Sequence, residues 1–152
     1  MGASDLDDMA RLLGDPVVMV HYPRPKTRDE AADWIAWNVE NYARDGFGLW
    51  MLYDGAGTFV GDCGLTWQRV DGVAYLEVGY HLLPEHQGKG LATEAATACR
   101  DHARACGIER LIAIMVPENL PSQRVAQRIG LALDRATVTS TGLPIHVYAA
   151  DL

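Results

Sequence analysis

The sequence has few of the features that serve a membrane protein or a disulfide framework. It contains three cysteines, Cys63, Cys99 and Cys106, and no C-x-x-C pair. An odd number without that spacing argues against both a disulfide framework and a thiolate zinc site, so we expect a reducing, cytoplasmic setting. No apolar run approaches the roughly 18 residues that span a membrane, and the acidic N-terminal segment is unlike a signal peptide. We therefore expect no membrane partner.

The sequence also lacks runs of basic residues and recognisable metal-binding motifs. Lysine and arginine total 13 against 20 aspartates and glutamates, which gives a formal net charge of -7. This balance predicts no nucleic-acid partner, whereas a cationic substrate would be attracted. The five histidines are scattered without H-E-x-x-H or comparable spacing, so we expect no metal ion.

What is present is the composition and patterning of one globular domain, residues 1–152. Of these residues, 49% are hydrophobic and 22% are charged, which is ordinary for a domain with its own core. Apolar periodicity predicts helices over residues 4–13, 27–45, 91–106 and 119–129. The predicted strands cover residues 47–53, 58–70 and 73–83, as an antiparallel meander, then 110–116, 132–139 and 145–149. This order predicts a mixed α/β (α+β) sheet sandwiched by helices.

Local signals mark the ends of the predicted helices. Ser4 followed by Asp7 resembles a capping box and predicts the start of a first helix that ends before Gly14. The sequence TRDE at 27–30 is a complete capping box for the second helix, which should stop at Gly46.

A glycine-rich stretch, QGKGLA at residues 87–92, lies between a predicted strand and a predicted helix. It is not a nucleotide P-loop, because Lys89 stands between the two glycines rather than after the last. A loop with so little side-chain bulk, followed by the free N–H groups of a helix, suits a phosphate or pyrophosphate, with Lys89 adding a positive charge. The alternative is a connection that binds nothing.

The motif QGKGLA resembles the Q/R-x-x-G-x-G/A signature of the GCN5-related N-acetyltransferase (GNAT) superfamily. The longer stretches EVGYHLLPEHQGKGLATEA and PENLPSQRVAQRIG, with LLGDP and GFGLW, are similar to its ribosomal-protein N-terminal alanine acetyltransferase-like (RimJ/RimL-type) branch. This similarity covers nearly all of the chain from Leu6 on. It implies a twisted, mostly antiparallel sheet flanked by helices, and a loop that holds the pyrophosphate of acetyl-coenzyme A.

The resemblance implies transfer of an acetyl group from acetyl-coenzyme A, the co-substrate, to a primary amine by direct attack. The acceptor would be a protein N-terminus or a small amine. A competing hypothesis is a non-catalytic acyl-coenzyme A-binding sensor or interaction module. Two departures from the family motivate that alternative: the first edge strand is missing, and Ala126 stands where some relatives place a catalytic tyrosine. The strand at 47–53 would then be an exposed edge that invites pairing with another chain, so a homodimer is possible.

Glu77 is our candidate for the base that takes a proton from the amine. Tyr75, Glu77, Gly79 and His81 share one face of their strand by alternation, and a carboxylate beside a glycine has room to act through water. A glutamate that only makes a structural salt bridge fits the pattern equally well. Ser122 is the candidate for protonating the thiolate, with helix capping as its alternative role.

The remaining site residues follow from the resemblance. Tyr22, Trp34 and Trp37 are expected on the acceptor side, although the tryptophans, Trp67 included, would otherwise belong to the core. Candidates for contact with the coenzyme are His81, Leu82, Leu83, Gln87, Gly88, Lys89, Gly90, Leu91, Ala92, Thr93, Asn119, Ser122 and Arg128.

Overall fold

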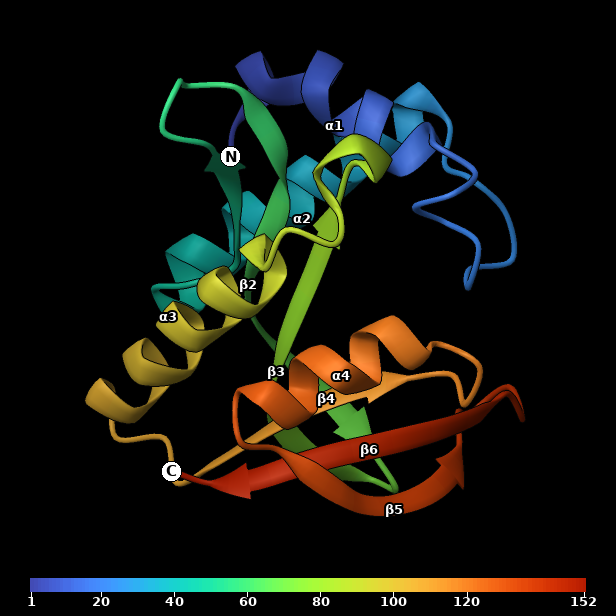
Figure 1. Ribbon diagram of the computed structural model, residues 1–152, viewed down its shortest axis with the longest axis vertical. Coiled ribbons are helices and arrows are strands. Elements are labelled where there is room, and N and C mark those ends of the chain that lie inside the picture. Colours follow the sequence, from blue (N-terminus) through green and yellow to red (C-terminus); the bar gives the residue numbers. More distant parts are fainter. The chain divides into compact units, whose positions relative to one another are not determined.

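The structure is a computed structural model that describes all residues, 1–152 (Figure 1). Two short 3-10 helices, η1 and η2, accompany four α-helices and six β-strands. In chain order the elements are η1 (Ala3–Asp5), α1 (Leu6–Gly14), α2 (Arg28–Asp45), β1 (Leu49–Tyr53), β2 (Phe59–Val70), β3 (Val73–Leu82), η2 (Pro84–His86), α3 (Leu91–Ala105), β4 (Arg110–Met115), α4 (Leu120–Arg128), β5 (Ala132–Val138) and β6 (Pro144–Asp151).

The strands form one sheet in the order β1-β2-β3-β4-β6-β5. The pairs β1–β2, β4–β6 and β5–β6 are antiparallel, and β3–β4 is parallel. The strands β2 and β3 are joined by the two residues Asp71 and Gly72, with φ of 51° and 82°, as a tight hairpin turn requires. The predicted mixed, mostly antiparallel sheet is therefore confirmed. No strand precedes α1, and β1 stands at one end of the sheet.

The chain forms two compact units. Unit 1 comprises Met1–Gly64 with Tyr80–Ala92, and unit 2 comprises Leu65–Gly79 with Thr93–Leu152. Each unit has a hydrophobic cluster of its own.

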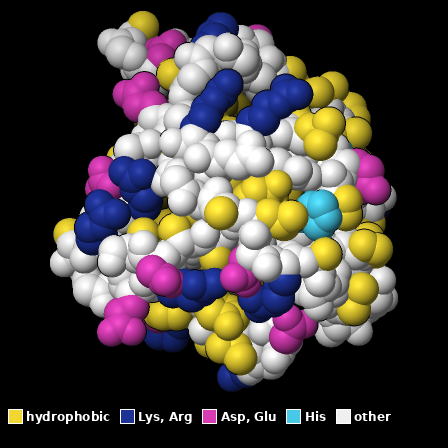
Figure 2. All heavy atoms as spheres, turned by 60° about the horizontal axis from the view of Figure 1, so that its bottom comes forward, with side chains coloured by type: hydrophobic (Ala, Val, Ile, Leu, Met, Phe, Trp, Pro, Cys, Tyr) yellow, Lys and Arg dark blue, Asp and Glu magenta, His cyan; other side chains and the backbone are white.

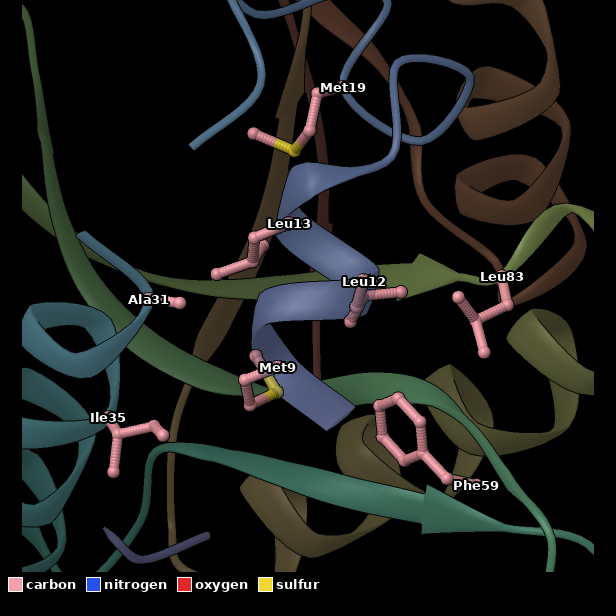
Figure 3. Packing of buried hydrophobic residues seen from close by; sticks show 8 residues of the cluster. All are labelled: Met9, Leu12, Leu13, Met19, Ala31, Ile35, Phe59 and Leu83. Carbon is pink, nitrogen blue, oxygen red and sulfur yellow. The ribbon is translucent and has the colours of Figure 1, made fainter. Parts of the chain in front are cut away.

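The core of unit 1 lies between its two helices, the start of β2 and the residue after β3 (Figure 3). Helix α1 contributes an apolar stripe because its hydrophobic residues recur at helical spacing. Burial of each such side chain contributes about 1.5–3 kcal/mol, so this cluster holds α1 and α2 together. Its members are Met9, Leu12, Leu13, Met19, Ala31, Ile35, Phe59 and Leu83.

The ends of α2 lie where the sequence predicted them, whereas the start of α1 differs from its prediction. The Glu30 N–H donates to the Thr27 hydroxyl at 3.2 Å, and the Glu30 carboxylate accepts from the Thr27 N–H at 2.7 Å. Gly46 ends the helix at φ 80°. The predicted Ser4–Asp7 box is wrong: Ser4 lies inside η1, and the Gly2 N–H donates to the Asp5 carboxylate at 2.7 Å instead.

The core of unit 2 is made by β2, β4 and β6. Val70, Ile112, Ile145, Val147 and Ala149 are buried together. The expectation that every tryptophan is mostly in the core fails in this unit, because Trp67 is 43% exposed.

The surface mixes charges of both signs. On the face shown in Figure 2, basic and acidic side chains are interspersed. In unit 2, Arg110 pairs with Asp134 and Asp151, and Arg135 pairs with Asp71. No helix combines the length and the apolar character needed to cross a membrane.

Candidate active site

The glycine-rich loop lies in unit 1, between the end of β3 and the start of α3. Residues 87–90 are exposed, and Gly88 and Gly90 have φ of 74° and 85°. Such backbone angles disfavour any residue with a side chain. A Cβ at either glycine would meet no atom within 4 Å, so the main chain of the loop is open to an approaching group.

The loop is anchored at its base and free at its tip. The Gln87 side chain donates to the Leu82 carbonyl at 2.9 Å, and the Leu83 N–H donates to the Val60 carbonyl at 2.9 Å. The N–H groups of Gly88, Lys89 and Gly90 donate no hydrogen bond within the chain.

Helix α3 adds the positive end of its dipole beside these amides. Its first N–H groups have no partners inside the helix and face the loop. Unpaired amides, open space and the exposed Lys89 side chain are the features that a pyrophosphate needs. The residues present therefore fit the phosphate end of a nucleotide-like coenzyme.

A second polar group of unit 1 is centred on His81 in β3. Its Nδ1 lies 2.8 Å from the Asp62 Oδ1 atom of β2, and its Nε2 lies 2.8 Å from the hydroxyl of Tyr22. Tyr22 belongs to the segment between α1 and α2. Gly61 makes this approach possible, because a Cβ there would lie 2.0 Å from the His81 carbonyl oxygen.

Asp62 and His81 form a buried ion pair. The Asp62 side chain has no exposed surface, and its second oxygen has no hydrogen-bond partner. Burial lowers the pKa of His81, but Tyr22 and the Asp62 carboxylate outweigh burial and raise it to about 10. Burial, followed by the charges of Asp62 and Asp5, also raises the pKa of Tyr42 to about 12.

Aromatic side chains surround this pair. The ring centroid of His81 lies 5.7 Å from that of Tyr22 and 6.1 Å from that of Trp34. Trp37 lies 5.3 Å from Trp34, and the Lys26 ammonium lies 5.3 Å from the centre of the Trp34 ring. The residues predicted on the acceptor side are thus brought together with His81.

Glu77, the predicted base, lies in unit 2 with a structural partner. The parallel ladder of β3 and β4 pairs Glu77 with Ile112, and two residues later the Ile114 N–H donates to the Glu77 carboxylate at 3.2 Å. The Glu77 carboxylate therefore has a structural role as the acceptor for a backbone N–H of β4.

Helix α4 carries the other predicted residues of unit 2. The Asn119 side chain accepts from the Ser122 N–H at 3.2 Å and so caps the start of this helix. Arg128 is exposed. Ala126, at the position of the tyrosine in some relatives, is fully buried. No group of His, Cys, Asp or Glu side chains is arranged to hold a metal ion.

Asp62 is the residue that reasoning from the sequence missed. It stands in FVGDCGL, an apolar stretch that the structure buries throughout. The sequence did carry a signal for Asp62, because a single carboxylate within an apolar strand needs a partner once the strand is buried.

The chain is similar to known acetyltransferases. The family model described as "Acetyltransferase (GNAT) domain" matches residues 1–132. The uncharacterized protein YkkB of Bacillus subtilis is 36% identical over 149 residues, which are 93% of this chain and 85% of that protein.

Solved structures show the same fold. An acetyltransferase from Agrobacterium tumefaciens superposes with a TM-score of 0.85 and 25% identity, covering 100% of this chain and 88% of that one. The ribosomal-protein-S5-alanine acetyltransferase of Vibrio fischeri gives a TM-score of 0.78 at 18% identity, covering 99% and 90%. A family model that spans most of the chain, together with a loop suited to a pyrophosphate, shows that this protein belongs to the GNAT family and is an acetyl-coenzyme A-dependent N-acetyltransferase.

Proposed function

We propose that residues 1–152 form a single acetyltransferase domain that acetylates a primary amine in the cytoplasm, and that a protein N-terminus is the favoured acceptor over a small amine. The observation that carries this proposal is the open, amide-lined loop at residues 87–90.

The loop and the first turn of α3 hold the coenzyme in this proposal. The main-chain amides of Gly88, Lys89 and Gly90 bind the pyrophosphate, and Lys89 adds charge. Gln87 fixes the loop to Leu82. The first residues of α3, Leu91, Ala92 and Thr93, complete the phosphate site. The thioester lies along the end of β3, at His81, Leu82 and Leu83. Further contacts with the coenzyme come from Asn119, Ser122 and Arg128 at α4.

The protonation state of the amine favours an N-terminus. Attack requires a neutral amine, and at pH 7 removing the proton costs about 4–5 kcal/mol for a lysine-like amine. The cost is only about 1 kcal/mol for an α-amine of pKa ~7.7–8.0. The bound thioester supplies the activated acetyl group. Glu77 is one candidate for proton removal and Ser122 is the candidate for protonating the thiolate, while Tyr22, Trp34 and Trp37 form the wall of the acceptor site.

The same sheet offers a place for a second copy of the chain. Strand β1 ends the sheet, and Tyr53 on it is 51% exposed. The Leu49 N–H and carbonyl at this edge are bonded to the Asn38 and Tyr42 side chains, so a second strand would pair with the part of β1 beyond Leu49. We therefore propose that two copies of the chain pair through β1. Sedimentation of the wild-type chain and of Met51→Pro tests it, because proline removes a donor from the edge; two identical monomer profiles would contradict it.

Release of free thiol tests the function. The protein is incubated with acetyl-coenzyme A and either alanine-initiated peptides or small amines such as polyamines, and the acetylated product is identified by mass. We expect release well above the buffer rate, with the peptides as better acceptors. Binding of the coenzyme without release on any amine would indicate a sensor and would contradict the proposal.

A further inference from the structure

The groups around His81 form a continuous hydrogen-bonded chain from the interior of unit 1 to its surface. Asp62 is fully buried, His81 joins it through Nδ1, and Tyr22, which is 41% exposed, joins His81 through Nε2. Both hydrogen-bonded distances are 2.8 Å. A fully buried carboxylate behind an imidazole, with an exposed hydroxyl in front, is the order of groups that moves a proton inward.

We propose that Tyr22 and His81 take the proton from the acceptor amine, and that Asp62 is the positioning residue which holds His81 in the required tautomer. This inference rests on the proposed acetyl transfer. It gives the role of base to a group other than Glu77, whose carboxylate already accepts the Ile114 N–H.

The proton balance of the step is complete. As the amine nitrogen forms its bond to the thioester carbon, its proton passes to the Tyr22 oxygen. The Tyr22 hydroxyl proton moves at the same time to Nε2 of His81, which becomes an imidazolium beside Asp62. The bond from carbon to sulfur then breaks, and its electron pair stays on sulfur. Water later removes the proton from His81.

The surroundings of His81 support this role. Tyr22 and Asp62 together raise the pKa of His81 against the effect of burial, and the Asp62 carboxylate lies against Nδ1 of the imidazolium that the step creates. The other charged or titratable groups near it are Tyr22, Tyr42, which feels the charge of Asp62, and Lys26 above Trp34. Trp34 closes one side of the His81 ring, so a bound amine would meet the Tyr22 hydroxyl against an aromatic wall.

The test is the pH dependence of kcat with an alanine-initiated peptide as acceptor. In the wild type, kcat should rise as His81 loses its proton, so activity should be highest at alkaline pH. His81→Gln should lower kcat by about 100-fold or more and remove this rise, and Tyr22→Phe should lower kcat similarly. Asp62→Asn should move the rise to lower pH, because one of the two groups that raise the pKa of His81 loses its charge while Tyr22 stays. A purely structural role would not produce that movement.

Controls separate this inference from the proposed function. Tyr53→Phe removes another exposed phenol hydroxyl and should leave kcat unchanged. Tyr22→Phe, Asp62→Asn and Tyr53→Phe should keep the wild-type affinity for acetyl-coenzyme A, and all variants should keep the wild-type circular dichroism. If Tyr22→Phe and His81→Gln keep the rise and most of kcat, or if Glu77→Gln removes the rise, the inference is overturned while the function stands. A wild-type protein that binds the coenzyme and acetylates no amine would overturn both.

Discussion

Asp62 is stable inside unit 1 only because His81 balances its charge. The transfer of an unpaired carboxylate from water into a protein interior is strongly unfavourable. Asp62 has no exposed surface, and its Oδ1 atom lies 2.8 Å from Nδ1 of His81 while its Oδ2 atom has no hydrogen-bond partner. The pair should therefore influence the stability of the fold as well as the chemistry.

The contribution of the Asp62–His81 pair to folding stability should fall as the pH rises. The pKa of His81 is raised from 6.5 to about 10 on folding, so its contribution to stability is fully present below about pH 6.5. It should be lost as the pH rises toward 10. Urea unfolding across this range should show the wild type losing stability, and His81→Gln should show a smaller loss. An equal loss in both proteins would contradict the buried ion pair.

Gly61 should tolerate no side chain. A Cβ there would lie 2.0 Å from the His81 carbonyl oxygen, whereas a Cβ at Gly55 would meet nothing within 4 Å. We expect Gly61→Ala to lower the free energy of unfolding by about 3 kcal/mol or more, since β2 and β3 must separate. Gly55→Ala, measured in the same urea titration, should change it by less than about 0.5 kcal/mol. Similar values for both variants would contradict the close approach.

The sequence predicted part of this residue-scale detail. It placed Glu77 and His81 on one strand face by alternation, and it identified Gly88 and Gly90 by their motif. It could not identify the partner of His81, because Asp62 is 19 positions away and only strand pairing brings the two together. Glu77 was chosen because a carboxylate beside Gly79 has room to act through water, yet its carboxylate also accepts a backbone N–H of β4.

At the scale of elements, the sequence predicted most of the helices and strands because their end signals are local. Thr27, Glu30 and Gly46 bound α2 through contacts within a few residues. The capping box predicted at Ser4 was wrong because a 3-10 helix precedes α1, and the sequence pattern of a capping box does not distinguish the two kinds of helix. The exposure of Trp67 was not predictable, because it depends on what covers that part of β2 rather than on the residue itself.

The cap of α2 gives a test at this scale. Thr27→Ala removes the hydroxyl that accepts the Glu30 N–H, and we expect a loss of about 1 kcal/mol in the free energy of unfolding. Ser140→Ala, at an exposed loop position, should change it by less than about 0.5 kcal/mol. Thermal unfolding of the two variants checks the difference, and equal melting temperatures would contradict the cap.

The loop before α3 should bind the coenzyme through its backbone. Gly88→Glu and Gly90→Glu add bulk, a disfavoured backbone angle and a negative charge to the phosphate site, so they should weaken acetyl-coenzyme A binding strongly. Glu77→Gln should affect binding far less. Gly142→Glu is the matched control, because Gly142 has φ 83° and equally open space, in the turn between β5 and β6. Calorimetry should detect no change for Gly142→Glu, and equal losses at Gly142, Gly88 and Glu77 would contradict this division of roles.

At the scale of the whole molecule, the net charge of the protein disfavours binding of the coenzyme. The protein carries a formal charge of -7, which attracts a cationic amine and repels an anionic coenzyme. Affinity for the coenzyme must then come from a local site that outweighs the overall field. The free amides of residues 88–90, the N-terminus of α3 and Lys89 are that site in our account.

The most direct measurement follows the backbone amides of Gly88, Lys89 and Gly90 by NMR during titration with acetyl-coenzyme A. Our account predicts that these three resonances shift together and saturate with the binding curve, because their N–H groups become donors to the pyrophosphate. If the coenzyme binds and moves other resonances while these three stay in place, the pyrophosphate lies elsewhere and the account is wrong.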